Sequence, residues 1–494
     1  MRCRRAPAGV KIPVFSVMKR LVFILVLCTF LTAGAPFCDG SEYLQVRGLM
    51  DLRTTFSDGG YDVETLVGMA RERGIGAVIL GDHDLVVMEY GMPPLRNVLK
   101  KREERNSLLK EGAGRYLRAI RDAERKHPGM VIIPGSLSTA FYYWTGHPLT
   151  GDLTAHNHER RILTVGMEMP IDYEELPVLH NRSSIRFLVH DLPAILLFSA
   201  AGLIGLLMLF WPGRWRVAGI IVLTLAVLLI INSNPFRNSP YDAYRGDQGM
   251  APYQLLIDYV GGRGGLTFWN YPETRSGIRR MGPIQVSTRP YPEVLQESHG
   301  YTGFSALYGD TIRATEPGGI WDRVLGDYCR GLRARPVWGI ATADYHREGE
   351  SGERLGNFQT VFFVTEKNKR AVLEAMRDGR MYALRGKFPH MARLDEFSVS
   401  SGETAVKAIS GGEIALQGAP RIRIALSSEN NLPGPVKIRL IRGGEVIGTF
   451  EDFLPLQIDY EDNTFRPGGK TYYRMDMHGA GTIVSNPVFV SLSP

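Results

Sequence analysis

The sequence predicts a parallel α/β fold that is interrupted by an apolar helical hairpin and followed by an all-β region. Between residues 43 and 386, short apolar runs alternate with amphipathic helix patterns, as in folds built from strand–helix units. Residues 192–211 and 217–231 are uncharged apolar segments. After residue 393, apolar and polar residues alternate at period two, which is typical of half-buried strands.

The first helix of the α/β part is predicted from apolar residues at i, i+3, i+4 and i+7, which are Val63, Leu66, Val67 and Ala70. Asp62 is placed to cap its start and Gly74 to end it. Residues 77–80 follow as a buried strand. Further strands are predicted at residues 131–133, 265–269, 337–342 and 360–364, and further helices at residues 115–126 and 367–377.

The two apolar segments predict a transmembrane hairpin. The first is close to the roughly 20 residues that a helix needs to cross the hydrocarbon layer. Only a five-residue turn, Pro212-Gly213-Arg214-Trp215-Arg216, separates them. The alternative is a buried helical pair in a soluble core, which is disfavoured because such helices usually show a polar face.

The N-terminus predicts export. Residues 21–35 are apolar and follow Lys19 and Arg20, which predicts a signal peptide or a retained membrane anchor. The basic residues before this segment favour a cytoplasmic start. A hairpin returns the chain to the side it left. We therefore expect a membrane protein whose flanking parts lie on the extracytoplasmic (periplasmic or extracellular) side.

Composition narrows the classes of partner. The net charge of +7 fits an anionic membrane surface or an anionic ligand. No run of Lys and Arg with interleaved aromatic residues stands out, so nucleic acid binding is not indicated. The 4 cysteines give no disulfide framework.

The C-terminal region predicts a β-sandwich of about 100 residues without a catalytic cluster. Its strands are expected at residues 421–426, 436–441, 445–450, 470–477 and 482–490, with a hairpin turn at Gly443-Gly444. The resulting organisation is an N-terminal signal or anchor (1–40), a first α/β part (41–190), the hairpin (191–233), a second α/β part (234–393) and the sandwich (394–494).

Three short segments of the α/β part carry side chains suited to chemistry. Asp58 precedes a helix, Asp82 and His83 directly follow a buried strand, and Asp344 and His346 directly follow another. The carboxyl ends of parallel strands are where α/β barrels build their active sites. Histidine and aspartate together suit zinc, manganese or iron.

The order of these segments resembles the PHP (polymerase and histidinol phosphatase) superfamily. Residues 49–59, LMDLRTTFSDG, look like the family's opening Asp-Leu-His-x-His-Thr run that ends in Ser-Asp-Gly. Residues 81–84 resemble its Thr-Asp-His, residues 133–135 the strand end before its bridging Glu, residues 269–272 its x-His-Pro and residues 341–346 its closing Asp-x-His. The resemblance implies a distorted seven-stranded β/α (TIM-like) barrel with up to three divalent metals, which hydrolyses phosphoesters.

The departures from the family pattern fall on its metal ligands. The two opening histidines fall on Asp51 and Arg53, the bridging Glu on Leu137 and the His before Pro on Tyr271. Leucine cannot bind a metal, arginine carries a permanent charge and no free lone pair, and a neutral tyrosine is a poor ligand. A hydroxide bridged by two metals therefore has almost nothing left to hold it.

The remaining matches imply one divalent metal (zinc, manganese or iron). Asp58, His83 and His346 match the third metal site of the family, and Asp344 survives from the first. Another family histidine falls on His156 or His158, and His158 is the preferred match. Asp344 and Asp82 are the candidate catalytic carboxylates.

Arg53 allows two interpretations. With Arg275 it could bind a phosphate or carboxylate, because a guanidinium offers a fixed charge and a planar fork. Alternatively, Asp51 and Arg53 form an ion pair that stabilises an inactive site.

Two functions follow. The chain is either a membrane-attached phosphoesterase (a phosphoric ester hydrolase) with a single metal, or a pseudoenzyme without metal. The pseudoenzyme would bind a phosphorylated or other anionic small molecule, or a partner protein.

Overall fold

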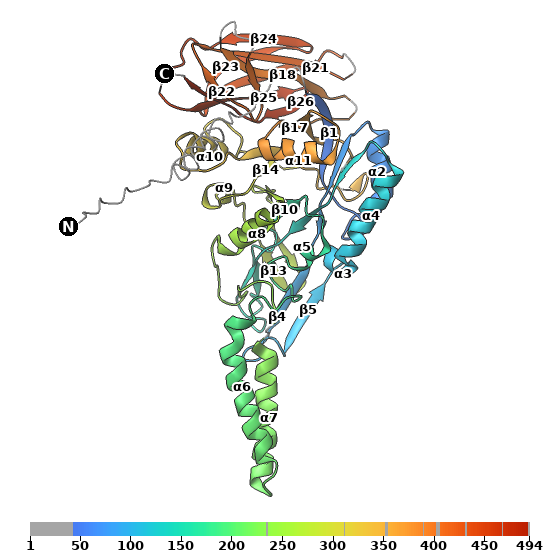
Figure 1. Cartoon of the computed structure of the whole chain (residues 1–494), viewed down its shortest axis with the longest axis vertical. Coiled ribbons are helices and arrows are strands. Elements are labelled where there is room, and N and C mark those ends of the chain that lie inside the picture. Colours follow the sequence, from blue (N-terminus) through green and yellow to red (C-terminus); the bar gives the residue numbers. More distant parts are fainter. Residues whose placement is uncertain are drawn as a thin grey trace, which may run out of the picture.

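The protein is an elongated molecule. The computed structural model describes residues 43–233, 236–310, 312–350, 354–388, 390–401, 406–429, 432–466 and 468–492. A helical hairpin forms one end, a mixed α/β body the middle and a largely β C-terminal region the other end (Figure 1). The predicted signal peptide or anchor at residues 1–40 lies outside the described residues, as do Cys3, Cys28 and Cys38.

One side of the α/β body belongs to a large sheet. Its strands here are β1 (Leu44–Leu52), β2 (Ala77–Leu80), β6 (Val131–Ile133), β16 (Phe358–Val364) and β17 (Met381–Arg385), in the order β17-β16-β1-β2-β6. β1, β2 and β6 run parallel, as predicted for strand–helix units, whereas β16 is antiparallel to both of its neighbours.

The other side of the body is a second sheet. Its strands are β3 (Asp82–His83), β7 (Gly135–Ser138), β10 (Arg161–Val165), β11 (Leu266–Asn270), β14 (Gly303–Leu307) and β15 (Trp338–Ala341), in the order β15-β14-β11-β10-β7-β3. The predicted parallel arrangement is wrong for β16, which was expected at residues 360–364, and for β10, a strand that was not predicted and is antiparallel to both β7 and β11. Short strands lead into β10 where a crossover helix would be needed to keep it parallel.

The two sheets meet at one edge of the body. The amide of Ala343 donates to the carbonyl of Met50 (3.0 Å), and the amide of Arg53 donates to the carbonyl of Tyr345 (2.9 Å). The strand ladders among the described residues fall into two sheets, which are joined here and also where β2 passes into β3 and β6 into β7 across one residue each, so a closed seven-stranded barrel stays a prediction. This junction brings the end of β1 next to the segment that follows β15.

Smaller sheets extend the body toward the hairpin. They comprise β4 (Val87–Gly91) with β5 (Lys100–Glu104), and β8 (Tyr143–Thr145), β9 (Thr154–His156), β13 (Ile284–Ser287) and β12 (Ile278–Met281). The helices of the body are α2 (Val63–Glu72), α3 (Leu108–Glu111), α4 (Ala113–Lys126), α5 (Pro170–Glu174), α8 (Ala251–Gly262), α9 (Val294–Glu297), α10 (Ile320–Cys329) and α11 (Lys369–Asp378).

Helix α2 follows its sequence pattern. The Asp62 side chain accepts a hydrogen bond from the Thr65 amide (2.7 Å), which satisfies one of the unpaired donors at the helix start. The residues that it buries are the four predicted ones. Gly74 follows the last turn with φ +68°, a left-handed conformation that ends a helix at little cost for glycine.

Helices α6 (Leu188–Met208) and α7 (Arg214–Ser233) form the hairpin that projects from the body (Figure 1). The spans Asp191–Met208 and Arg214–Ser233 are long and apolar enough to cross a membrane, by length and composition. Only 6% and 11% of these spans are buried, so they are not core helices of the body. Gly205 and Gly219 mark the closest approach of the two helices, because a Cβ on Gly205 would lie 2.7 Å from the Leu223 amide nitrogen.

The C-terminal region contains two packed sheets around its own apolar cluster. Its strands are β18 (Ala392–Ser401), β19 (Lys407–Ile409), β20 (Glu413–Leu416), β21 (Pro420–Ser428), β22 (Pro435–Arg442), β23 (Glu445–Phe453), β24 (Leu456–Glu461), β25 (Thr471–Gly479), β26 (Gly481–Ser485) and β27 (Val488–Leu492). β26 pairs with β17, so the large sheet runs without interruption from the body into this region.

One predicted strand of this region is wrong. Residues 482–490 form two strands, β26 and β27, separated by Asn486 and Pro487. The Asn486 side chain accepts from the Gly339 amide (2.7 Å) and donates to the carbonyls of Gly339 and Met381. Pro487 has no amide N–H to continue the strand ladder, and the Asn486 side chain instead hydrogen-bonds to the backbone of the body.

A buried ion pair joins the region to α10. Arg474 on β25 donates to both carboxylate oxygens of Asp322 (2.7 and 2.6 Å) and to the Thr315 carbonyl (3.0 Å). Tyr472 also donates to Asp322 (2.8 Å). Both charged side chains are almost fully buried.

We expect Arg474→Met to lower the free energy of unfolding by about 3–5 kcal/mol, because it leaves a buried carboxylate without its counter-charge. Adding Asp322→Leu to this variant should restore part of the loss. The exposed pair Arg421–Glu461 is the control, and Arg421→Gln should change stability by less than about 1 kcal/mol. Urea unfolding measures all three, and equal losses in Arg474→Met and Arg421→Gln would contradict the role of the buried pair.

Candidate functional site

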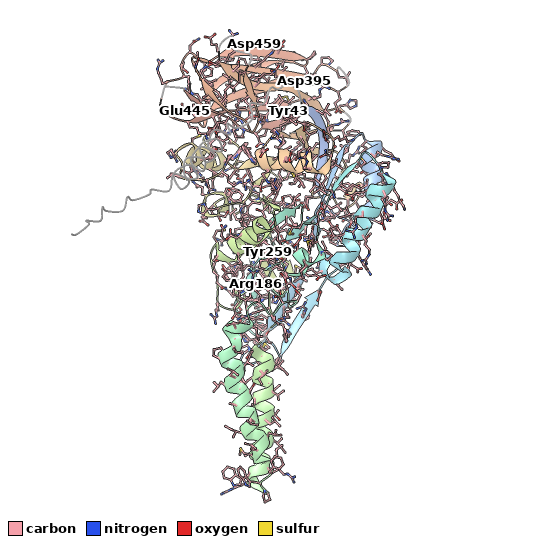
Figure 2. All side chains as sticks on the ribbon, in the orientation of Figure 1. Tyr43, Arg186, Tyr259, Asp395, Glu445 and Asp459 are labelled. Carbon is pink, nitrogen blue, oxygen red and sulfur yellow. The ribbon has the colours of Figure 1, made fainter. Side chains whose placement is uncertain are left out.

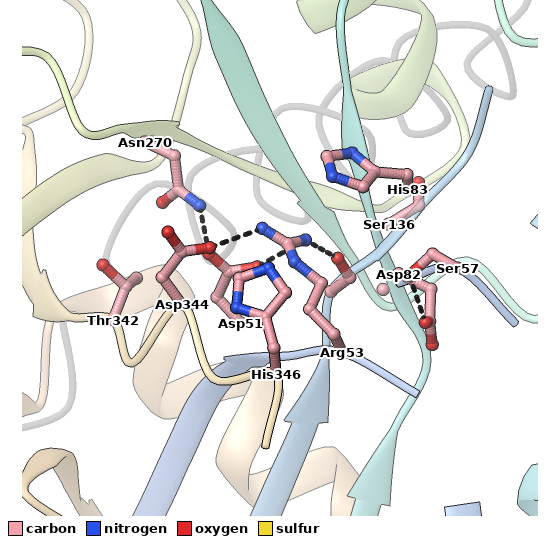
Figure 3. A network of polar contacts seen from close by, with 12 residues as sticks. Asp51, Arg53, Ser57, Asp82, His83, Ser136, Asn270, Thr342, Asp344 and His346 are labelled. Atoms are coloured by element: carbon pink, nitrogen blue, oxygen red, sulfur yellow. Dashed lines mark hydrogen bonds and ion pairs between the residues drawn. The ribbon is translucent and has the colours of Figure 1, made fainter. Parts of the chain in front are cut away.

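The candidate site lies where the two sheets of the body meet. The ends of β1, β3 and β11 and the segment after β15 bring Asp51, Arg53, His83, Asp344 and His346 together (Figure 3). These residues are far apart in the sequence but are neighbours here because the carboxyl ends of parallel strands share one edge.

Arg53 is the centre of the arrangement. Its side chain is fully buried, and its guanidinium lies 3.1 Å from an oxygen of Asp51 and donates to Asp344 (2.9 Å). It also donates to the carbonyl of Gly81. Burial disfavours the charged form, but the carboxylates of Asp51 and then Asp344 outweigh it and hold the pKa of Arg53 above its ordinary value. The guanidinium is therefore a permanent buried cation.

Asp51 lies beside Arg53 and is also buried. Its second oxygen accepts hydrogen bonds from the Asn270 side chain (2.8 Å) and from the Tyr271 hydroxyl. Burial raises the pKa of Asp51 to about 6, against the opposing effect of Arg53. Tyr271 thus donates to a carboxylate, and burial raises the pKa of its hydroxyl well above the ordinary value.

Three residues of this network have a left-handed backbone although none is glycine. They are Asp51 (φ 64°), Tyr271 (φ 51°) and Asp344 (φ 47°), and each lies directly at or after the end of a central strand. Such a conformation costs about 1–3 kcal/mol per residue and persists only where surrounding contacts impose it. The ion pairs and hydrogen bonds around Arg53 are the contacts that hold these strand ends.

A second group of side chains surrounds Asp58. One carboxylate oxygen of Asp58 lies 3.5 Å from Nε2 of His83 and 3.6 Å from Nε2 of His346. Burial raises the pKa of Asp58, but the contacts with His346 and His83 outweigh this and hold it well below its ordinary value. Burial, with help from Arg53 and Arg161, lowers the pKa of His83 to about 3, so its imidazole is neutral at pH 7.

The residues as placed do not form a metal centre. Within the ranges that the structure describes, no three His, Cys, Asp or Glu side chains are gathered in a metal-binding arrangement. The donor types of Asp58, His83 and His346 are those of a single divalent-metal site, which stays a prediction. However, the Arg53 Nε lies 4.0 Å from Asp58, and a fixed guanidinium charge repels a cation placed there. Leu137 is buried on β7 beside His83, where the family would place its bridging carboxylate.

Asp82, a predicted catalytic residue, is buried and fully engaged. One of its oxygens accepts from the Thr54 amide (2.7 Å) and the Ser57 hydroxyl (2.6 Å), and the other accepts from the Thr54 hydroxyl (2.8 Å). These bonds fix the loop that carries Asp58. Asp82 is thus bound to this loop and Asp344 to Arg53, and the catalytic roles of these two carboxylates stay predictions.

A cavity of about 520 Å³, here called the site cavity, opens beside this cluster. Asp58, His83, His158 and Arg161 are among the polar side chains that line it. The other charged lining residues are Glu103, Glu104, Arg105, Glu159 and Arg279, and these three glutamates are paired with Lys101, Arg102 and Arg279. The preferred match, His158, thus lies in the cavity, and burial lowers its pKa to about 4. His156 lies elsewhere, stacked on Tyr143 with ring centroids 4.8 Å apart.

Arg275 lies exposed in the loop after β11, where its amide donates to Asp310 (2.9 Å). No ion pair or hydrogen bond joins it to Arg53 within the described chain. Two guanidinium cations do not bond each other directly, so the joint binding of an anion by Arg53 and Arg275 stays a prediction.

Arg161 is the site residue that the sequence reasoning missed. It begins β10 opposite Asn270 on β11, and because β10 is antiparallel its first residue lies at the edge where its parallel neighbours end. Within the described chain its guanidinium has no hydrogen-bond or ion-pair partner, and its Nε is buried. No local sequence pattern marks Arg161 as a site residue, because the direction of β10 is set by its pairing with β7 and β11.

Comparisons with known proteins give neighbours in structure alone. No protein-family model matches the chain, and no curated protein matches its sequence. One similar solved structure is a two-domain protein from Bacteroides vulgatus with a predicted PHP-like metal-dependent phosphoesterase (14% identity, TM-score 0.35, covering 89% of this chain and 92% of that one).

Two further neighbours cover less of the chain. One, from Bifidobacterium adolescentis, is provisionally named a metal-dependent phosphoesterase (16% identity, TM-score 0.27, 63% of this chain and 90% of that one). The other is an amidohydrolase from Chromobacterium violaceum with bound sulfate and no metal (12% identity, TM-score 0.28, 62% and 90%). With TM-scores this low, the neighbours carry no weight for the function of this chain.

Asp84 provides a test of the electrostatics beside the site. Its carboxylate is buried, one oxygen accepts from the Leu85 amide (2.6 Å), and burial raises its pKa to about 7. The folded state then binds more protons than the unfolded state between about pH 4 and pH 7, so the contribution of Asp84 to stability falls as pH rises through that range.

We expect Asp84→Asn to be more stable than the parent protein at pH 8, with the gain disappearing toward pH 4. The slope for one proton cannot exceed about 1.4 kcal/mol per pH unit. Urea unfolding at several pH values measures it, with the exposed Asp122→Asn as control. A gain that does not depend on pH would contradict the raised pKa.

Proposed function

We propose that this chain is a membrane-attached, PHP-like protein whose site cavity binds an anionic group, such as a phosphate, without a metal centre. The observation that carries the proposal is Arg161, a guanidinium without a partner that lines a cavity beside the buried Arg53. A cation with an unpaired buried nitrogen is stabilised when an anion supplies both charge and acceptors.

The contacts of Arg53 support a pseudoenzyme. Its guanidinium lies between the strand-end carboxylates of Asp51 and Asp344, so the negative charge of these carboxylates is balanced by a side chain and needs no metal ion. Arg53 itself is occupied on three sides and serves as an ion-pair partner. The anion would therefore meet Arg161 and the neutral imidazoles of His83 and His158.

A second candidate is a phosphoesterase with one metal. It is favoured by the two imidazoles that direct Nε2 toward one oxygen of Asp58, which is the donor set that a single zinc, manganese or iron ion would use. Such an ion, when bound, would supply a water of lowered pKa for hydrolysis. Arg53 near Asp58 opposes this candidate.

Metal analysis and anion binding on the purified full chain separate the two. We expect less than about 0.1 ion per chain after incubation with zinc, manganese and iron, and saturable binding of inorganic phosphate by calorimetry. Arg161→Gln should weaken phosphate binding by about tenfold or more, since a charge-assisted hydrogen bond contributes roughly 1.5–3 kcal/mol.

The matched control is Arg118→Gln on the exposed face of α4, which should leave phosphate binding unchanged. One ion per chain that disappears in His83→Ala, together with hydrolysis of an aryl phosphate, would establish the single-metal enzyme in place of the pseudoenzyme. Phosphate binding that Arg161→Gln does not weaken would refute the anion site.

We also propose that α6 and α7 span the bilayer, with the body and C-terminal region on the extracytoplasmic side. Length, hydropathy and exposure of the two helices support the spans. The basic N-terminus and the two arginines of the hairpin turn, Arg214 and Arg216, support the orientation.

Cysteine labelling tests this orientation in a variant whose four native cysteines are replaced by serine. In spheroplasts, a membrane-impermeant maleimide should label Thr449→Cys on β23. It should label Arg214→Cys in the hairpin turn only after permeabilisation. The opposite pattern would reverse the orientation, and labelling of both without permeabilisation would refute the spans.

A further inference from the structure

A second cavity of about 390 Å³ lies where the hairpin joins the body, here called the hairpin-base cavity. Its lining includes Asp191 from the start of α6 and Asn232 and Ser233 from the end of α7. It also includes Glu89 on β4 and Arg96 in the following loop. It shares Leu179 with the site cavity but none of the residues around Arg53.

The cavity carries more positive than negative charge. Glu89 is almost fully buried, yet three cations surround its carboxylate, namely Arg182 (2.7 Å), Lys100 (3.1 Å) and Arg102 (3.4 Å). Lys100 and Arg102 approach Glu89 from outside the lining, and Arg102 is shared with Glu104 (2.9 Å). The charged side chains that line the cavity itself are Arg96, Arg182, Arg237 and Arg245 against Glu89, Asp191 and Asp242, which leaves one cation in excess. A surplus of positive charge in a partly enclosed space favours an anion.

Arg96 is the lining cation without a counter-charge, because Arg182, Arg237 and Arg245 each pair with a lining carboxylate. Its guanidinium lies over the ring of Tyr244, 3.9 Å from the centroid, and no carboxylate pairs with it in the described part of the chain. Stacking on an aromatic ring fixes the plane of the guanidinium while leaving its N–H groups available. Arg237, by contrast, is paired with Asp191 (2.6 Å) and contributes no surplus.

The position of the cavity identifies the kind of anion. Helices of 18–20 residues rise about 27–30 Å, which matches the hydrocarbon thickness of a bilayer. Asp191 and Ser233 therefore fall at the hydrocarbon boundary, and the cavity beyond them falls at the depth of the lipid headgroups. The body is fixed to the hairpin at this level, because Asn97 bonds to Asn232 through its amide (3.0 Å) and its side chain (2.7 Å).

The figures agree with this placement. Side chains of the hairpin project outward along its length, whereas the labelled Arg186 and Tyr259 lie in the body just beyond its base (Figure 2). Arg186 lies 5.9 Å from the Tyr259 ring centroid. Arginine and tyrosine at this level are typical of residues in the interfacial layer.

We propose that the hairpin-base cavity binds the phosphate of an anionic phospholipid headgroup, with Arg96 and Arg182 as its contacts. The proposal rests on the proposed membrane attachment. Net-anionic lipids are preferred over zwitterionic lipids because the ammonium group of the latter would meet the surplus cations. The apolar faces of α6 and α7 beside the cavity receive the acyl chains.

The test uses the full chain purified in detergent and measures thermal unfolding during titration with phosphatidylglycerol, phosphatidylcholine or inorganic phosphate. Incorporation of the same protein into vesicles of each lipid tests the membrane attachment separately. We expect phosphatidylglycerol to stabilise the protein with half-saturation at a concentration at least about tenfold lower than phosphatidylcholine. Inorganic phosphate should need a far higher concentration, because it lacks the acyl chains.

The double variant Arg96→Gln/Arg182→Gln should lose this preference. Glu89 keeps Lys100 and Arg102 in it, so its buried carboxylate remains compensated. Arg118→Gln/Arg121→Gln, which removes two exposed arginines of α4, is the matched control and should keep the preference. If the double variant does not fold, Arg96→Gln alone should weaken the preference, because Arg96 has no carboxylate partner to lose.

Three outcomes would overturn the proposal. Equal half-saturation by the two lipids, in a protein that incorporates into vesicles of both, would refute the headgroup site and leave the membrane attachment intact. Inorganic phosphate acting at the same concentration as phosphatidylglycerol would make the ligand a free anion. Failure to incorporate into either vesicle would refute the attachment itself.

Discussion

The buried guanidinium of Arg53 is the interaction on which the candidate site depends. An isolated charge in a protein interior costs several kcal/mol, and Arg53 is retained because Asp51, Asp344 and the Gly81 carbonyl surround it. The same contacts impose left-handed backbone on the two aspartates. The charge of Arg53, the backbone conformation of the strand ends and the junction of the two sheets therefore depend on one another. Removing Arg53 would disturb the packing of the two sheets as well as the site.

The elements that could be predicted from sequence are those with a strong local pattern. Helix α2 has its cap, its apolar face and its terminal glycine in one short stretch, and the structure reproduces all three. The grouping of Asp58, His83 and His346 was expected from a strand-end rule together with a family resemblance, and the structure brings these residues together.

What could not be predicted depended on pairing between distant segments. The direction of β10 is set by its neighbours β7 and β11, so Arg161 gave no local sign that it faces the site. Likewise, the sequence could suggest an Asp51–Arg53 pair but not that Asp344 would complete it from the other end of the body. Arg275 carried the right charge but lies in an exposed loop.

A single layer of side chains separates the two cavities. Tyr142 lines the site cavity, and its hydroxyl lies 2.7 Å from Nε2 of His180, which lines the hairpin-base cavity. Leu179 lines both. Burial lowers the pKa of His180 to about 3, so this contact is a neutral hydrogen bond between the two spaces.

The pairing of β17 with β26 has a consequence for the independence of the C-terminal region. Strand β17 is central only because the C-terminal strands continue the sheet beyond it. Cutting the chain after β17 would leave its backbone donors and acceptors unpaired along one side, and an open strand edge of this kind invites pairing with other chains. The C-terminal region thus covers the edge of the body's large sheet. We expect the body and this region to unfold as one cooperative unit.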